Sequence, residues 1–273
     1  MRKLTAIFLL ILCLPIPSFA WGPEGHQVVG DVARAHLTGT TRQRIHELLG
    51  NDDLASVSTW ADEVRSQRPE TYGWHFVDIP MNADGFVESR DCFRIDEKHP
   101  EANQDHHNCV VDRISIFERV LADRNASTTD RVEALKFLVH FVGDVHQPLH
   151  AMGEARGGND IHVVEFGSAQ CGTRPCNLHF VWDVGLIDHT GRDEHAYTAY
   201  LQQLIASHNL QKRAQGTPAD WANESFHLGH RVWLDEGGQV DETYYKKNIE
   251  IVNERMALAG LRLARLLNEA LGK

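Results

Sequence analysis

The sequence predicts a mostly α-helical fold, with many helices in a single domain and a short β-hairpin. Apolar residues recur with helical periodicity in most segments between residues 23 and 271. In the segment 130–145 they cover nearly every side of the predicted helix, which is typical of a helix at the centre of a bundle. No internal repeat or biased linker divides residues 21–273, and 42% of the chain is hydrophobic, enough for one substantial core.

The other helices are predicted from their apolar spacing and end signals. Thr40 or Thr41 can cap the second helix, which ends at Gly50. The segment 177–189 is expected to be helical or turn-like. The remaining helices are predicted at residues 23–37, 42–49, 56–65, 107–121, 196–208, 218–234 and 242–271.

Four segments lack helical periodicity. Residues 71–80 are rich in aromatic and β-branched side chains and are predicted to be extended. Residues 81–105 are polar and are predicted to form a loop. The glycine-containing stretch 156–160 is predicted to be a turn, and residues 161–166 a short hairpin strand.

The first twenty residues have the features of a secretory signal peptide. Two basic residues precede an apolar core at 6–14, and Ser-Phe-Ala at 18–20 is a small-x-small cleavage site. The apolar run is interrupted by proline and too short for a transmembrane anchor. We therefore expect cleavage after Ala20, Trp21 as the mature N-terminus, and a secreted or periplasmic protein with no stable membrane association.

Four cysteines remain once the signal peptide is removed. An even number in an exported chain favours disulfides over thiolate metal sites. Pairing of Cys92 with Cys109 and of Cys171 with Cys176 is the simplest of three possible connectivities. A cysteine-based zinc site is not expected, because no two cysteines have Cys-x-x-Cys spacing.

The mature chain is acidic and rich in histidine. Loss of the two basic residues at positions 2 and 3 leaves 25 basic and 38 acidic residues, a formal charge of −13. This argues against a nucleic-acid binder that works through a broad basic surface. It does not exclude an enzyme whose cations are bound metal ions. The 17 histidines favour a metal site, although histidine is also an ordinary surface residue.

The central helix carries three potential metal ligands near its end. Asp130 can cap its start, and Pro148 ends it because proline lacks an N–H and disfavours helix at the preceding residue. His140 and Asp144 are four residues apart and therefore lie on one face. His150 follows the helix end and can turn toward a neighbouring ion. The alternative is a buried helix with hydrogen-bonded polar residues.

Other segments place the same ligand types beside large aromatic residues. Asp62 follows Trp60, and His75 follows a second tryptophan. His179 and Asp183 repeat the four-residue spacing of the central helix, and two such pairs on facing helices can build a carboxylate–imidazole metal cluster. Histidine and aspartate without cysteine suit zinc or another borderline divalent ion.

The predicted N-terminus could also bind metal. The free amine and the carbonyl of Trp21 can chelate an ion, and His26 can add a ligand from the next turn. The alternative is an ordinary exposed N-terminus with a hydrogen-bonded histidine.

Taken in order, these segments resemble the zinc-dependent single-strand nuclease and 3′-nucleotidase family, which is structurally akin to bacterial zinc phospholipase C. The match runs from Trp21 to about Ser225. The resemblance implies one catalytic nuclease domain over residues 21–273, with a cluster of three zinc ions in a cleft. The expected ligands of the first ion are Asp62, His75, His140 and Asp144, those of the second are His150, His179 and Asp183, and those of the third are Trp21, His26 and the bridging Asp144.

The resemblance also assigns roles in catalysis and substrate binding. Asp62 would orient the attacking water, and Arg65 would help to clamp the scissile phosphate. Phe76 offers a ring for stacking a base, and Asp78 a carboxylate for the base edge. We interpret Asn159 as a residue that orients the phosphate, with a simple turn residue as the alternative.

The implied reaction is endonucleolytic hydrolysis of single-stranded DNA and RNA to 5′-phosphate products, together with removal of phosphate from 3′-nucleotides. Only a base free of its duplex partner can stack on Phe76, which gives a physical reason for single-strand preference. The alternatives are a zinc phospholipase C and a non-catalytic zinc-binding protein of the envelope. We expect a monomer, and we interpret His146 as lying outside the ligand set, behind the cluster or at the surface.

Overall fold

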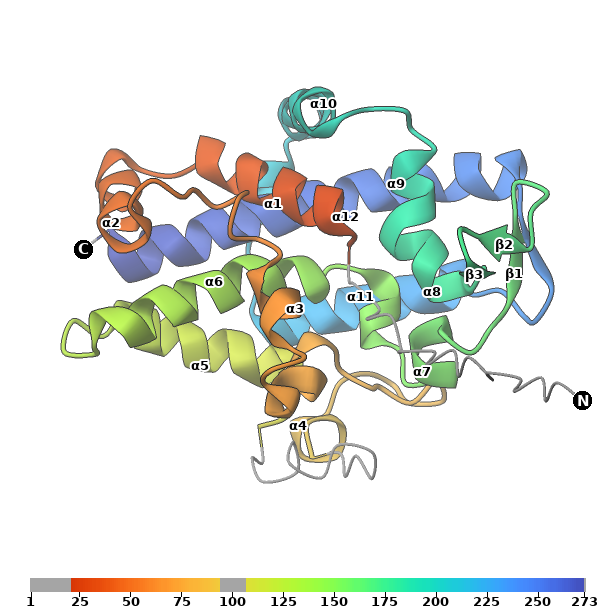
Figure 1. The fold of residues 1–273 in the computed structure, drawn as a ribbon, viewed down its shortest axis with the longest axis horizontal. Coiled ribbons are helices and arrows are strands. Elements are labelled where there is room, and N and C mark those ends of the chain that lie inside the picture. The colour runs from red at the N-terminus through yellow and green to blue at the C-terminus, as the bar shows by residue number, and fades with distance from the viewer. Residues whose placement is uncertain (1–20, 94–106, 273) are drawn as a thin grey trace, which may run out of the picture.

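The computed structural model describes residues 21–93 and 107–272. It confirms the mostly helical fold: helices pack lengthwise around α6 and α12, and the short strands lie at one end (Figure 1). The predicted signal peptide and part of the predicted 81–105 loop lie outside the described residues. The α-helices are α1 (Pro23–Ala35), α2 (Gly39–Leu49), α3 (Trp60–Val64), α4 (Glu88–Asp91), α5 (Val110–Ala122), α6 (Thr128–Asp144), α7 (Ala155–Gly158), α8 (Leu178–Phe180), α9 (Leu186–Asp188), α10 (Glu194–His208), α11 (Pro218–Val232) and α12 (Glu242–Leu271).

Shorter helical turns connect several of these helices. Within residues 21–93 and 107–272, three are 3₁₀ turns, and one is a π-helical turn between α8 and α9. They are η1 (Pro69–His75), η3 (Pro148–Ala151), the π-helical η4 (Val181–Gly185) and η5 (Leu210–Arg213).

The central position predicted for α6 is confirmed. Every residue from 137 to 152 is buried, so the end of α6 and the following η3 run through the interior. Helix α6 lies against α5, and it also contacts α1, α3 and α12. The ligand-type residues of this segment are therefore core residues, and their polar atoms need partners inside the protein.

Both N-terminal helix caps named from the sequence are wrong, whereas the second helix ends at Gly50 as predicted. Helix α6 begins at Thr128, two residues before Asp130, and its cap is Ser127, whose hydroxyl oxygen accepts the Asp130 N–H at 3.1 Å. Helix α2 is capped by Thr38, whose hydroxyl accepts the Thr41 N–H at 3.1 Å. Each segment offers several capping residues, and the packing of the preceding chain selects among them.

The prediction of an extended segment at 71–80 is wrong for its first half. Residues 71–75 belong to the 3₁₀ helix η1, which begins at Pro69. From Phe76 onward the chain is extended, and the side chains of Phe76 and Asp78 are half-exposed whereas Val77 and Ile79 are buried. Aromatic content reports packing as much as backbone preference, and this explains the error.

The predicted strand at 161–166 is also misplaced in its pairing. Strand β1 (Val163–Glu165) pairs in parallel with β4 (Gly238–Val240), from the far end of the chain. The hairpin is instead formed by β2 (Gln170–Cys171) and β3 (Arg174–Pro175). Sequence alone favours pairing between neighbouring segments, but the partner of β1 is distant in sequence.

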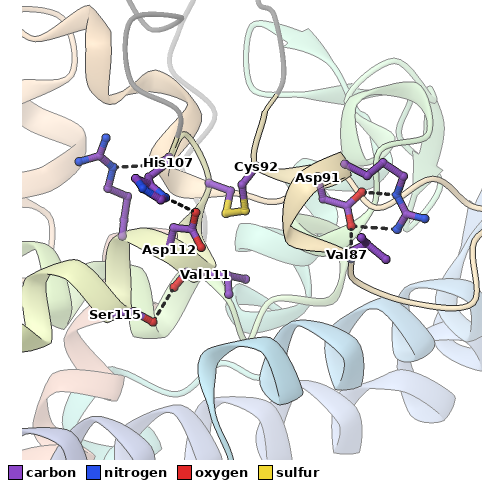
Figure 2. Close-up of a disulfide and its surroundings, with 10 residues drawn as sticks. Val87, Asp91, Cys92, His107, Val111, Asp112 and Ser115 are labelled. Carbon is purple, nitrogen blue, oxygen red and sulfur yellow. Dashed lines mark hydrogen bonds and ion pairs between the residues drawn. A yellow bond between two sulfur atoms is a disulfide. The ribbon is translucent and has the colours of Figure 1, made fainter.

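Both predicted disulfides are present. Cys171 and Cys176 close the β2–β3 hairpin, and Cys92 and Cys109 join the chain after α4 to the start of α5. Figure 2 shows Cys92 between the ion pair of Asp91 with its neighbouring arginine and the contact of His107 with Asp112.

The region around the Cys92–Cys109 disulfide also anchors the extended segment that begins at Phe76. Next to Cys109, the Val110 N–H donates to the carbonyl of Phe76 at 3.0 Å. The backbone of Phe76 is therefore fixed against the start of α5.

Among the described residues, no helix is both long enough and apolar enough to cross a membrane.

Helices α1 and α12 approach closely at Gly260. A Cβ atom placed there would overlap the side chain of Val32. We predict that Gly260→Leu lowers the free energy of unfolding by about 1–3 kcal/mol through overpacking, measured by thermal unfolding. Gly39→Ala is the control, because a Cβ at Gly39 has nothing within 4 Å. Unchanged stability of the Gly260 variant would contradict this close contact.

Candidate metal centre

Eight histidine and aspartate side chains converge in the interior of the bundle. All are at least 95% buried, although they come from helical elements spread over most of the chain. Their potential ligand atoms include three groups within each of which the atoms lie within 4.8 Å of one another. The groups are His26, His140 and Asp144; Asp62, His75 and His140; and His150, His179 and Asp183.

Asp144 stands between two of these groups. Its Oδ2 lies 3.1 Å from His75 Nδ1 and 3.3 Å from His140 Nε2, while its Oδ1 lies 3.4 Å from His26 Nε2. The two oxygens therefore face different histidines. Such an orientation suits a carboxylate that bridges two cations.

Three of the histidines are oriented by backbone carbonyl groups. His140 Nδ1 donates to the carbonyl of Ser58 at 2.7 Å, and the Nδ1 atoms of His150 and His179 donate in the same way at 2.8 Å. A carbonyl can only accept, so the proton of each neutral ring is on Nδ1. The lone pair on Nε2 then faces the cluster, as in metal-binding histidines that are oriented by a second hydrogen bond.

Several buried polar atoms of the cluster have no hydrogen-bond partner. These include both ring nitrogens of His26, both carboxylate oxygens of Asp62, His75 Nε2 and Asp144 Oδ1. Two further acceptor atoms, His150 Nε2 and His179 Nε2, lie only 3.1 Å apart. Buried groups of this kind are costly unless something satisfies them. The nitrogen and oxygen donors fit a divalent cation such as zinc.

Burial also sets the charge of the cluster. It lowers the pKa of His26 and His75 well below the usual value, and the neighbouring charges of other histidines and of arginine lower it further. Burial raises the pKa of Asp144 and Asp183 well above the usual value, and the nearby Asp62 carboxylate adds to the rise. The imidazoles are thus held in the neutral form that binds metal, and a bound cation would favour the ionised carboxylates.

The predicted N-terminal residue is fixed beside this cluster. Trp21 is fully buried, and its indole Nε1 donates to the carbonyl of Gly143 at 3.0 Å. The N–H of Gly22 donates to the carbonyl of Asp183 at 2.7 Å. The start of the described chain is therefore attached both to the end of α6 and to η4.

Two of the predicted substrate residues lie at the edge of the cluster. Arg65 Nη1 is 3.6 Å from Asp62 Oδ1, and its guanidinium lies 5.6 Å from the ring of Tyr72. The half-exposed ring of Phe76 meets Tyr72 edge-on at 5.8 Å between centroids. Arg65, Tyr72 and Phe76 thus form one continuous surface that leads away from the buried aspartate.

Asp78 lines an open cavity of about 670 Å³. The cavity combines carboxylate, amide and guanidinium groups with the apolar side chains of Pro80 and Met81. Its lining residues are Asp78, Pro80, Met81, Asn82, Arg90, Asp91, Gly153 and Glu154.

The profile described as S1/P1 Nuclease matches residues 21–272. This chain belongs to the S1/P1 nuclease family. The resemblance seen in the sequence is confirmed, and the chain is a nuclease, an enzyme that hydrolyses phosphodiester bonds. The family match begins at residue 21, immediately after the predicted cleavage site.

Curated relatives of this nuclease cover nearly its whole length. It is 30% identical to Nuclease P1 of Penicillium citrinum, over 92% of this chain and 98% of that protein. It is 26% identical to Nuclease S1 of Aspergillus oryzae, over 98% of each chain. It is 28% identical to Endonuclease 2 of Arabidopsis thaliana, over 92% of this chain and 91% of that protein.

His146 of the nuclease is not a tenth ligand. Its Nδ1 donates to the carbonyl of Val142 at 2.7 Å, and its Nε2 accepts from Arg262 Nη1 at 2.9 Å. Both ring nitrogens are thus engaged, one by α6 and the other by α12, and the residue is fully buried. The interpretation that placed it outside the ligand set agrees with these contacts, whereas a surface position is wrong.

Asn159 lies in a sharply bent turn. Its amide donates to the carbonyl of Arg156 at 3.0 Å, and Arg156, Gly157 and Gly158 all have positive φ. This bond supports the turn interpretation. A role in orienting phosphate stays a prediction.

Residues that support the cluster were not recognised in the sequence. Gly143 leaves room for His26, because a Cβ there would lie 2.8 Å from His26 Nδ1. Gly157 leaves room for His179 in the same way and accepts its ring N–H. A glycine inside the strongly apolar α6 was the one available signal, since glycine is unfavourable in a helix without a packing reason.

We predict that Gly143→Ala weakens metal binding without weakening the helix. Alanine favours helix over glycine, but its methyl group would displace His26. The variant should lose its bound metal at chelator concentrations at which the wild-type protein keeps its metal, as measured by elemental analysis. Gly39→Ala is the matched control. Equal metal retention in both variants would contradict the proposed crowding.

A second prediction concerns pH. A free imidazole protonates near pH 6.5, whereas burial lowers the pKa of His179 to about 4. A lowered pKa preserves the neutral, metal-binding form to more acidic pH. Bound metal should therefore be retained at pH 5.5 and lost as the pH approaches 4, measured by elemental analysis after equilibration. Loss of half the metal near pH 6.5 would contradict the effect of burial.

Proposed function

We propose that this nuclease is a zinc-dependent endonuclease that cuts single-stranded DNA and RNA to 5′-phosphate products and also removes phosphate from 3′-nucleotides. The main support for this proposal is the buried cluster of histidine and aspartate atoms that lack hydrogen-bond partners. Arg65 contacts Asp62 of this cluster and, through Tyr72, connects it to the half-exposed ring of Phe76. Family membership supports the reaction type.

We further propose three zinc ions as the cofactor. Asp62, His75, His140 and Asp144 would hold one ion, and His150, His179 and Asp183 a second. Trp21 and His26 would hold the third together with Asp144. The two differently oriented oxygens of Asp144 support its bridging role.

When bound, the zinc ions would activate water for attack and stabilise negative charge on the phosphate. The protein supplies orientation around them. Asp62 has buried carboxylate oxygens without hydrogen-bond partners, so it can accept a hydrogen bond from the attacking water and direct it toward phosphorus. Arg65 lies beside Asp62 and can donate to the phosphate oxygens.

The same surface accounts for substrate choice. A base that has left its duplex can stack on Phe76, and Asp78 can accept hydrogen bonds from the base edge. In this acidic protein, few lysine or arginine contacts to phosphate are expected, so activity should fall only modestly as salt rises. We also propose export after cleavage of residues 1–20.

The direct test is a substrate panel. Single-stranded DNA, RNA and 3′-AMP should be hydrolysed, and fully paired DNA much more slowly. Phosphatidylcholine tests the runner-up function, a zinc phospholipase C. Activity confined to the lipid would overturn the nuclease substrates proposed here.

Asp62→Asn tests the role of the carboxylate. We predict a fall in kcat of about 10²–10⁴-fold, the usual contribution of a positioned acid–base group. Metal content is measured on the same sample to separate catalysis from zinc loss. Asp53→Asn, at an exposed site, is the control. Full activity of the Asp62 variant would refute this mechanism, and a wild-type chain that binds zinc without any hydrolysis would favour the non-catalytic alternative.

Processing at Trp21 gives a separate prediction. An extra residue before Trp21 converts its amine into an amide, which cannot act as a neutral amine ligand. The extended chain should bind one zinc ion fewer and lose most of its turnover, as compared with a chain that begins at Trp21. Full activity and metal content in the extended chain would contradict the ligand role of Trp21.

A further inference from the structure

Gln147 lies between Asp144 and His150 in the buried segment and contacts the opposite side of the metal cluster. Its side chain is fully buried. The amide Nε2 donates to Asp183 Oδ1 at 2.6 Å, and Oε1 accepts the Leu149 N–H at 2.5 Å. A backbone N–H can only donate, so it fixes Oε1 on its side and directs Nε2 to the carboxylate.

This hydrogen bond distinguishes the two oxygens of Asp183. Oδ1 is engaged by Gln147, whereas Oδ2 lies 3.4 Å from His179 Nε2. His150 Nε2 lies farther away, 3.9 Å from Oδ1. The carboxylate is therefore held by Gln147 at Oδ1, while Oδ2 faces His179.

The backbone just before Gln147 is held by hydrogen bonds from α11 and α12. Ser225 Oγ donates to the carbonyl of Val145 at 2.5 Å, and Arg255 Nε donates to the carbonyl of His146 at 3.1 Å. Arg255 is fully buried and forms an ion pair with Glu224 at 2.5 Å. Helices α11 and α12 thus hold the turn between α6 and η3 through a buried polar network.

We propose that Gln147 is a positioning residue that orients Asp183 toward a bound metal ion and couples the 144–150 segment to η4. This role rests on the proposed metal centre and assigns no direct contact between Gln147 and metal or substrate. Outer hydrogen-bond partners of metal ligands typically contribute 10–100-fold to metal affinity. The uncharged amide can do this without adding a further charge to the buried cluster.

The test uses two substitutions of different character. Gln147→Met replaces the side chain with one of similar size and removes both of its hydrogen bonds. Gln147→Glu preserves the size and the acceptor for Leu149 but, when ionised, cannot donate to Asp183. Gln202→Met is the matched control, because Gln202 is a half-buried glutamine of α10 that contacts His36 at 2.9 Å.

Two readouts separate positioning from general stability. Zinc affinity is measured by competition with a chromogenic chelator at pH 8, and the cobalt-substituted protein is compared by its visible absorption spectrum. Both Gln147 variants should bind their weakest zinc ion about 10–100-fold less tightly and show an altered cobalt spectrum. The Gln202 variant should match the unchanged chain in both.

The possible failures are distinguishable. If the folded Gln147 variants bind zinc and cobalt as the unchanged chain does, the positioning role is wrong while the metal centre stands. If the unchanged chain binds neither ion, the proposed centre fails and the role of Gln147 falls with it. Circular dichroism verifies folding, and the similarly sized Gln147→Glu decides the result if Gln147→Met does not fold.

Discussion

Burial of eight potential metal ligands in one core is the constraint on which the rest of the structure depends. Three carboxylates and five imidazoles lie among apolar helices, and several of their atoms have no protein partner. Such an interior is unfavourable unless cations complete it. Metal binding and folding are then linked, because ligands that are scattered in the unfolded chain come together only in the fold.

The helices satisfy this constraint by supporting the ligands from outside the cluster. Carbonyl groups from Ser58 and Gly157 orient histidine rings, and small glycines allow His26 and His179 to approach. The polar network of α11 and α12 fixes the turn between α6 and η3. Stability of the bundle and geometry of the site are therefore determined by many of the same contacts.

The sequence predicted the parts of the centre that depend on side-chain type and local spacing. His140 with Asp144, and His179 with Asp183, could be recognised because four residues make one helical turn. The supporting carbonyls carry no such signal, since every residue has one. The 3₁₀ helix at 69–75 and the parallel pairing of β1 with β4 depend on contacts between segments distant in sequence, so propensity and local pairing predicted them wrongly.

Zinc content is the most direct measure of the central claim, that the buried cluster is a three-metal centre. The sample is the chain beginning at Trp21, purified without chelators at neutral pH and examined by elemental analysis against protein concentration. Three zinc ions per chain are expected. A folded chain that contains no zinc and takes none up on addition would contradict the claim.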